Sequence, residues 1–224
     1  MPLEIYLVRH GKTVFNTTGR LQGWSDSPLT PEGKAVAERL GKGLAAHHIR
    51  FDAAFSSTAP RAAETAGLIL QHSGHANLAL RTLPDLREYC FGGFEGELNH
   101  VLQNQIAAAL GLPDADTWRQ AYRTADHHLL AETVSALDEL ALAENEAAFL
   151  GRLRRGMEEV VRQSAGLQRI LVVSHGMSIT AILKSIDFPI IEYRSVDNAS
   201  VSRLRVQDGT WHIDSIGETG FLAD

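Results

Sequence analysis

The chain has 224 residues, of which 44% are hydrophobic and 21% are charged. This length fits one domain with an insertion rather than two full catalytic domains, and the composition excludes a mostly disordered or fibrous chain. The formal net charge of −6 gives no electrostatic support for nucleic-acid binding. No run approaches the ~18 apolar residues of a membrane span, no signal-peptide pattern opens the chain, and Cys90 is the only cysteine. We therefore expect a cytoplasmic protein without disulfides.

The first third of the chain predicts two strand-to-helix units. The apolar run 3–8 ends at the Arg-His-Gly sequence of 9–11, which is typical of a buried strand followed by a polar turn. Thr30 begins a helix, because threonine is a good N-cap and the next residue is proline. A second apolar stretch over 51–55 leads into a helix that starts near Pro60.

Residues 97–145 differ in character from the rest of the chain. They are rich in Ala, Leu, Gln and acidic residues, and they contain few β-branched residues. Between 95 and 146 there are ten acidic and two basic residues. We expect an inserted acidic helical segment that caps the domain and is interrupted at 111–113. A further amphipathic helix is predicted over about 147–164.

The strand-to-turn unit recurs near the end of the chain. The apolar run 170–173 is followed by Ser-His-Gly at 174–176, and residues 200–215 predict a hairpin that turns at 208–209. Alternating strands and helices predict an α/β domain with a largely parallel sheet. Such sheets bind ligands outside the carboxyl ends of their strands, so we expect His10 and His175 to meet in one crevice.

Two histidines at strand ends suit nucleophilic chemistry on a phosphate ester. Imidazole has an ordinary pKa near 6.5 and forms covalent intermediates. Arg9 adds a planar cation suited to phosphate oxygens. Gly11 and Gly176 leave no side chain beside the rings, which lets a substrate approach. Either histidine taken alone is better explained as a buried structural residue, whereas the matched pair with Arg9 favours a site.

Two further sequences strengthen this hypothesis. Ser57 and Arg61 stand four residues apart near a helix N-terminus, where amides favour anions. Glu88 precedes the glycine-rich run 91–96 and has the chemistry to protonate a leaving oxygen. Taken singly, Arg61 also suits a surface ion pair and Glu88 a solvated loop.

Four sequence blocks resemble the histidine phosphatase superfamily, also called the phosphoglycerate mutase-like family. They occur in the family's order and cover most of the chain outside 97–145. The resemblance implies a three-layer α/β/α sandwich with a mostly parallel central sheet, as a single domain over 1–224 with a helical cap insertion at about 97–145. The blocks are 7–13 with Asn16, Gly19-Arg20, Gly23 and 26–33; 57–61 with Ala62, Thr65 and Ala66; 86–88 with Gly92 and 94–96; and 173–176.

The resemblance also implies a role for individual side chains within the blocks. His10 attacks phosphorus and becomes a phosphohistidine, while Arg9, Arg61 and His175 hold the phosphoryl oxygens. Glu88 acts as general acid and base. No metal or other cofactor is required, because arginines and histidines supply the positive charge. Further substrate contacts are implied for Asn16, Gln22, Gly23 and Ser57.

These roles predict a metal-independent phosphomonoesterase acting on a small phosphorylated metabolite, with no nucleic-acid or membrane partner; a homodimer is left open. Lys12 replaces the family's usual glutamate and adds a cation near the site. Residues 97–118 contain no Lys or Arg to bind the second anionic group of a phosphoglycerate, unless Arg119 or Arg123 folds in. The phosphatase is therefore favoured, and the alternative is a phosphoglycerate mutase primed by 2,3-bisphosphoglycerate. A third hypothesis is a non-catalytic protein that binds a phosphorylated ligand.

Overall fold

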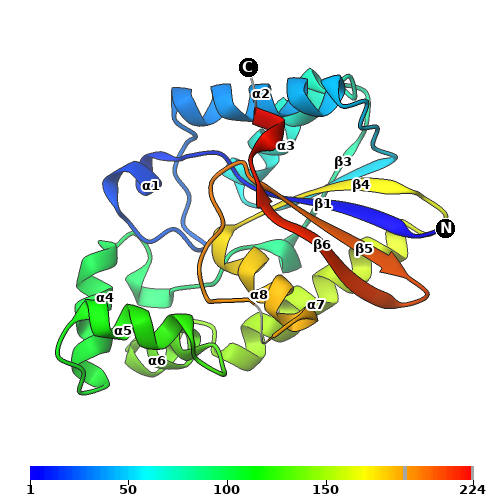
Figure 1. Cartoon of the computed structure of the whole chain (residues 1–224). Helices are drawn as coiled ribbons and strands as arrows, with labels where there is room; N and C mark the ends of the chain where they lie inside the picture. The colour runs from blue at the N-terminus through cyan, green and yellow to red at the C-terminus, as the bar shows by residue number, and fades with distance from the viewer. Residues whose placement is uncertain (189–190, 223–224) are drawn as a thin grey trace.

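A mixed sheet forms the centre of the molecule (Figure 1). The computed structural model describes residues 1–188 and 191–222. The strand order is β3-β2-β4-β1-β5-β6; the first four strands are mutually parallel, β5 is antiparallel to β1, and β6 is antiparallel to β5. The α/β class predicted from the sequence is confirmed. The strands are β1 (Leu3–Arg9), β2 (Ala53–Ser57), β3 (Leu80–Leu83), β4 (Arg169–Ser174), β5 (Val201–Gln207) and β6 (Thr210–Glu218).

The two central strands, β1 and β4, carry the two histidines out of the sheet at the same level. Their register pairs Val8 with Val173 and Arg9 with Ser174. The next residue of β1 is His10, whose backbone N–H donates to the carbonyl of Ser174 at 3.0 Å. The register is therefore the physical reason why residues 165 positions apart in sequence become neighbours.

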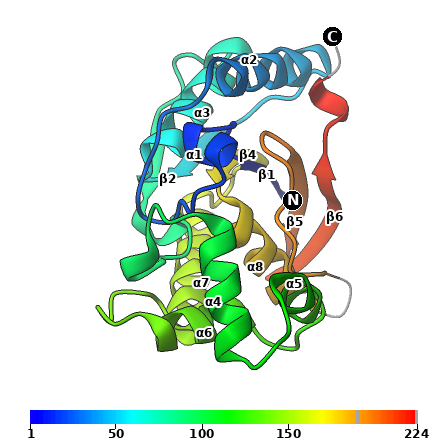
Figure 2. The ribbon, with the colours of Figure 1, turned by 90° about the vertical axis from the view of Figure 1, so that its left-hand side faces the viewer.

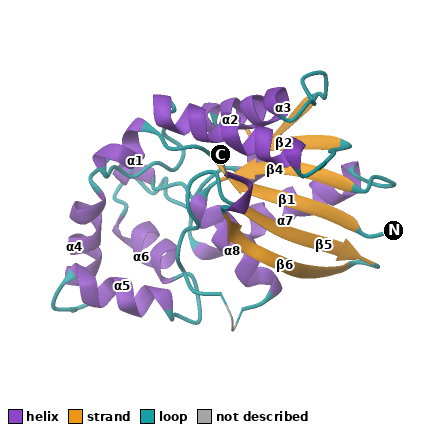
Figure 3. Ribbon diagram, turned by 45° about the horizontal axis from the view of Figure 1, so that its top comes forward, coloured by secondary structure: helices purple, strands orange, loops and turns teal. Residues whose placement is uncertain are grey.

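Helices cover both faces of the sheet, as Figure 3 shows. Helices α2 (Pro31–Ala46) and α3 (Pro60–His72) pack on one face, and α7 (Glu146–Gln163) and α8 (Gly176–Ile186) pack on the other. Along β1, Ile5 and Leu7 point into one core, and Tyr6 and Val8 point into the other. A strand buried on both faces reads as a continuous apolar run, which is how its sequence appears.

The segment 97–145, named here the cap segment, lies beyond the carboxyl ends of the parallel strands (Figures 1 and 2). Its helices are α4 (Asn99–Ala109), α5 (Ala115–Arg123) and α6 (Leu129–Leu137), and the first interruption falls at the predicted 111–113. The short helix α1 (Val14–Thr18) lies on the same side. Among the described residues, no helix is long and apolar enough to span a membrane.

The polypeptide between β3 and α4 consists of short turns rather than long elements. Two 3-10 helices, η1 (Pro84–Leu86) and η2 (Gly92–Phe94), flank the loop that carries Glu88. At the other end of the chain, Asp208 and Gly209 both have positive φ, 52° and 78°, as the predicted hairpin turn requires. The 3-10 helix η3 (Gly220–Leu222) then packs against α2.

Candidate active site

His10 lies directly after β1 and is buried, with 4% of its surface exposed. Its Nδ1 lies 2.8 Å from the carbonyl oxygen of Gly11. A carbonyl can only accept, so we assign the ring proton to Nδ1, which leaves the lone pair on Nε2. Burial, with the charges of Arg61 and Arg9, holds the pKa of His10 well below its ordinary value. The ring is therefore neutral at physiological pH.

His175 packs against His10 with ring centroids 5.2 Å apart. Its Nε2 lies 2.7 Å from the hydroxyl of Ser57, which already accepts the N–H of Ala59 at 3.2 Å. We assign the hydroxyl hydrogen of Ser57 to Nε2, which places the proton of His175 on Nδ1. Among the described residues Nδ1 has no hydrogen-bond partner. Burial, followed by the charge of Arg61, lowers the pKa of His175 well below 6.5.

Arg61, in the first turn of α3, is 1% exposed. Its Nε points at Nε2 of His10 at 3.4 Å. Its two terminal nitrogens donate to four acceptors of one loop: the carbonyls of Gln22 (3.2 Å), Gly23 (2.9 Å) and Ser25 (3.0 Å), and a carboxylate oxygen of Asp26 (2.7 Å). The guanidinium is thus a fixed cation beside the lone pair of His10. Burial lowers the pKa of Arg61, and its bond to Asp26 opposes that effect.

Arg9 is the last residue of β1 and lies beside the histidines. Its Nη1 donates to the carbonyl of Val196 at 2.6 Å, and its Nε has no partner in the part of the chain that the structure describes. Burial lowers the pKa of Arg9, while the charge of Glu88 acts in the opposite direction. The charges of Arg9 and Arg61 therefore both act on the His10 ring, and Nε of Arg61 donates to its Nε2.

Glu88 is 6% exposed and sits at the N-terminus of α8. Its Oε1 accepts the N–H of Tyr89 at 2.9 Å and both the N–H and the hydroxyl of Ser178, at 3.0 and 2.9 Å. Its Oε2 accepts one bond, from the N–H of Met177 at 2.9 Å. The helix thus gains a carboxylate cap, which its own N-cap residue, His175, does not provide. Oε2 keeps a lone pair available for a proton.

A cavity of about 350 Å³ opens above these groups, with the cap segment as its far wall. Of the residues predicted from the sequence, Arg9, His10, Asn16, Gln22 and Glu88 line it. Arg61, Ser57 and His175 lie behind the wall and act on His10 or on one another. About half of the remaining lining is apolar or aromatic: Leu21, Phe91, Leu102, Ile106, Trp118, Tyr122, Leu130, Met177 and Tyr193.

The positive charge at the cavity comes from arginines rather than from Lys12. The ammonium of Lys12 pairs with Glu32 at 3.2 Å, and Lys12 is not part of the lining. Arg119 and Arg123, which the sequence left free to fold in, both line the cavity, together with Arg20 and Arg194. Arg119 pairs with Asp116, whereas Arg123 and Arg194 form no ion pair among the described residues. The acidic cap segment therefore presents cations to the site.

The two glycines that follow the histidines differ in their surroundings. A Cβ on Gly11 would meet the carbonyl oxygen of Gly33 at 2.7 Å, which makes Gly11 a packing position against α2 rather than a space for substrate. A Cβ on Gly176 would lie 2.7 Å from the hydroxyl of Ser195 and 3.2 Å from Cζ of Arg9. Only Gly176 therefore leaves room for side chains that line the cavity, namely those of Ser195 and Arg9.

Three polar residues of the site were not identified from the sequence. Asp26 holds Arg61, and its place within the second half of the first block was the available signal. Asn198 donates to the carbonyl of His10 at 2.9 Å and to Oδ1 of Asn16 at 3.3 Å. Arg194, like Asn198, comes from the connection between α8 and β5, whose path no local pattern indicates.

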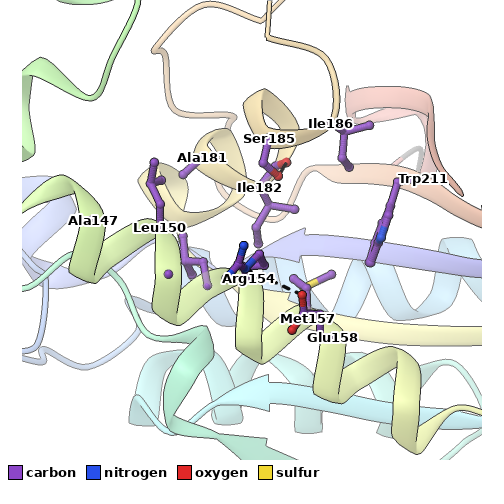
Figure 4. Close-up of a pocket in the computed structure, with 12 residues that line it drawn as sticks. Ala147, Leu150, Arg154, Met157, Glu158, Ala181, Ile182, Ser185, Ile186 and Trp211 are labelled. Atoms are coloured by element: carbon purple, nitrogen blue, oxygen red, sulfur yellow. Dashed lines mark hydrogen bonds and ion pairs between the residues drawn. The ribbon is translucent and has the colours of Figure 1, made fainter. Parts of the chain in front are cut away.

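A larger cavity, of about 660 Å³, lies away from this chemistry. It is formed between α7, α8 and β6, with Leu150, Met157, Ile182 and Trp211 on its walls (Figure 4). None of the site residues predicted from the sequence lines this larger cavity. We therefore place the candidate active site in the smaller cavity. Across residues 1–188 and 191–222, no group of three metal-ligating His, Cys, Asp or Glu side chains is present.

Comparison with known proteins identifies the family. The model of the histidine phosphatase superfamily, branch 1, matches residues 5–219. The chain belongs to this superfamily. A 2,3-bisphosphoglycerate-dependent phosphoglycerate mutase of Hamiltonella defensa is 30% identical over 82% of this chain and 77% of its own length. The crystal structure of a phosphoglycerate mutase from Bacillus anthracis superposes with a TM-score of 0.92 at 34% identity, covering 99% of this chain and 95% of that one.

A protein named as a phosphatase shares the fold. The structure of a mycobacterial glucosyl-3-phosphoglycerate phosphatase superposes with a TM-score of 0.71, covering 97% of this chain and 99% of that one. At 22% identity this likeness concerns the fold alone. Both mutases and phosphatases are therefore found among proteins that resemble this chain.

Proposed function

We propose that the protein is a metal-independent phosphomonoesterase that works through a phosphohistidine on His10. The observation that carries the proposal is the contact of His10 Nδ1 with the carbonyl of Gly11, which assigns the lone pair to Nε2, where it accepts a long bond of 3.4 Å from Nε of Arg61 that attack on phosphorus replaces. Nε2 forms a bond to phosphorus as the ester P–O bond breaks. Arg9, Arg61 and Nδ1–H of His175 stabilise the charge that spreads over the phosphoryl oxygens.

Glu88 is proposed as the general acid and base. Oε2, the carboxylate oxygen with a single hydrogen bond, carries the proton that the leaving alkoxide receives. The alcohol leaves with that proton; a water molecule then gives one of its own protons to the Glu88 carboxylate as its oxygen attacks phosphorus, and the N–P bond breaks to release inorganic phosphate. Ser57 supports this chemistry by holding the proton of His175 on Nδ1, and Asn16 and Gln22 line the pocket as substrate contacts.

The cavity wall favours esters whose organic part is partly apolar. Phe91, Trp118, Tyr122 and Tyr193 contribute aromatic rings to the wall. Tyr122 stacks on both Trp118 and Tyr193, with centroids 5.4 and 4.9 Å apart. An apolar group transferred from water to this wall contributes roughly 25 cal/mol per Å² buried. Glycerate has no apolar surface of this kind, so hydrolysis of larger monoesters is the function that the lining supports best.

A phosphoglycerate mutase is the second candidate, because specific observations favour it. Arg123 and Arg194, without ion-pair partners in the described ranges, line the cavity and would hold the carboxylate or second phosphoryl group of a phosphoglycerate. The curated relative and the structure that resemble this chain at 30% and 34% identity both bear the name of a mutase. The two candidates differ in whether water or a second substrate oxygen accepts the phosphoryl group.

A side-by-side assay separates the two candidates. Release of inorganic phosphate from a naphthyl phosphate would be compared with isomerisation of 3-phosphoglycerate after priming with 2,3-bisphosphoglycerate. The phosphomonoesterase proposal predicts the larger kcat/KM for the aryl ester, and little change in that value for Arg123→Gln combined with Arg194→Gln. Fast isomerisation that is lost in this double variant, with slow phosphate release, would establish the mutase instead.

A further inference from the structure

One loop supplies nearly all the contacts of Arg61. Residues 22–26, named here the cradle loop, connect α1 to α2 and contain no helix or strand. Apart from His10, every hydrogen-bond acceptor of the Arg61 guanidinium belongs to this loop. Three of the four are backbone carbonyls, so the position of Arg61 depends on the orientation of the loop's peptide groups.

Glu95 holds the opposite side of two of these peptide groups and the N–H of the residue that follows them. Its carboxylate accepts the N–H groups of three consecutive residues: Gly23 at 3.1 Å, Trp24 at 2.7 Å and Ser25 at 3.0 Å. It also accepts the hydroxyl of Ser25 at 2.6 Å and the N–H of Phe91 at 3.0 Å. Hydrogen bonds to an ionised acceptor are about twice as strong as neutral ones. One carboxylate therefore fixes the direction of all three N–H groups.

Two peptide groups, Gln22–Gly23 and Gly23–Trp24, lie directly between the two charges, with the N–H of each on Glu95 and the carbonyl of each on Arg61. The N–H groups of the cradle loop point to the Glu95 carboxylate, and its carbonyls at Gln22, Gly23 and Ser25 point to the Arg61 guanidinium. Gly23 permits this close approach, because a Cβ there would overlap the carbonyl of Tyr89 and the carboxylate of Glu95. A chain of direct contacts thus runs from Glu95 through the loop to Arg61 and to Nε2 of His10.

We propose that Glu95 is a positioning residue that sets the geometry of Arg61 through the cradle loop. The inference rests on the proposed function, in which Arg61 stabilises the transferring phosphoryl group. Glu95 touches neither the nucleophile nor the substrate, and it is absent from the cavity lining. Its loss lowers the rate of phosphoryl transfer by displacing Arg61, since a displacement of ~1 Å in an active site costs on the order of 100-fold.

The test is a pair of matched glutamine substitutions in two backgrounds. Glu95→Gln places an NH₂ group opposite two or three of the five donors that the carboxylate binds. Glu97→Gln changes an exposed glutamate whose carboxylate, among the described residues, accepts only the N–H of Leu98. We expect Glu95→Gln to lower kcat for aryl phosphate about 100-fold with a smaller change in KM. Glu97→Gln should match the wild type.

The second background is the Arg61→Lys variant. Lysine keeps the positive charge but lacks the planar guanidinium that donates to the carbonyls of the cradle loop. In this background Glu95→Gln should lower kcat by less than about 3-fold, because coupled residues are not additive. Equal losses in both backgrounds would show a merely structural role and overturn the proposal. So would a folded Glu95→Gln protein with wild-type kcat.

Two further measurements keep the proposal testable if Glu95→Gln folds poorly or the wild type lacks hydrolase activity. Ser25→Ala removes a single hydroxyl contact and should lower kcat about 5-fold, again only when Arg61 is present. By NMR, the Nε–H of Arg61 in the free protein should exchange slowly in the wild type and in Glu97→Gln, and rapidly in Glu95→Gln. Unchanged exchange would overturn the role of Glu95. Absence of turnover in the wild type alone would refute the phosphomonoesterase instead.

Discussion

Arg152 offers a strong test of how the loop that carries Glu88 is held in place. This arginine lies on the inner face of α7, and its guanidinium binds the carboxylate of Glu144 with two bonds of 2.7 Å. The remaining donors reach the carbonyls of Asp85, Arg87 and Glu88, at 3.0, 2.8 and 3.2 Å. One buried side chain therefore satisfies three carbonyls of the segment that ends in the proposed general acid.

The expected cost of Arg152→Met follows from burial. The side chains of Arg152 and Glu144 are only 8% and 13% exposed. Removing one partner of such a pair leaves an uncompensated charge, which costs about 3–5 kcal/mol of unfolding free energy. Methionine has a similar length, so the loss of packing volume is small. We expect the free energy of unfolding in urea to fall by this amount.

Two comparisons distinguish this reasoning from a general sensitivity of the helix. Replacing both partners, as in Arg152→Met with Glu144→Met, removes the unpaired charge and should be less destabilising than Arg152→Met alone. Arg162→Ala removes an ion pair from the exposed side of the same helix, where Arg162 is 72% exposed, and should leave stability unchanged. A loss below about 1 kcal/mol for Arg152→Met, or strict additivity of the two substitutions, would refute the argument.

Three further predictions concern titration and packing. Because the pKa of His10 is held well below 6.5, the nucleophile stays unprotonated in mild acid, and the acid limb of kcat/KM should lie below pH 6.5. Burial lowers the pKa of His128 to about 4, so the unfolded chain binds the extra proton between pH 6.5 and about 4. Stability, fully present above pH 6.5, should fall through this window by up to about 3 kcal/mol, and urea unfolding of His128→Asn should show a shallower fall. Gly11→Ala should destabilise by about 1–3 kcal/mol through its contact with Gly33, whereas Gly67→Ala, with open space in α3, should be neutral or stabilising in thermal melts.

The sequence predicts the centre of the site because that centre depends on local patterns. The apolar runs before His10 and His175 mark adjacent parallel strands, and their common register brings the rings together. Arg61 and Glu88 were selected by motif position, and the structure places both beside His10 or on the cavity wall. Each of these inferences needs only a strand, a turn and a helix start.

The rest of the site depends on contacts that no local pattern encodes. Arg194 reaches the cavity from an irregular connection after α8, and the cations of the cap segment turn inward although its overall charge is acidic. The position of Arg152 in the sequence does indicate a buried ion pair. It falls on the apolar face of its helix with Phe149 and Leu153, where an arginine must find a buried partner.

The contacts of Glu95 and Gly11 also could not be predicted from the sequence. Both residues occur in sequence blocks that resemble the family, yet a block does not say which atoms a residue contacts. For Gly11 the decisive neighbour is a carbonyl of α2, and for Glu95 it is a loop some 70 residues away.

The most direct test of the central claim is covalent. Wild type and His10→Ala would be mixed with an aryl phosphate in the presence of a chelator, and phosphate release and the mass of the quenched protein would be followed together. The account predicts sustained turnover and one phosphoryl group on His10 in the wild type, with neither in the variant. Turnover that persists in His10→Ala, or that requires an added metal ion, would contradict the phosphohistidine mechanism.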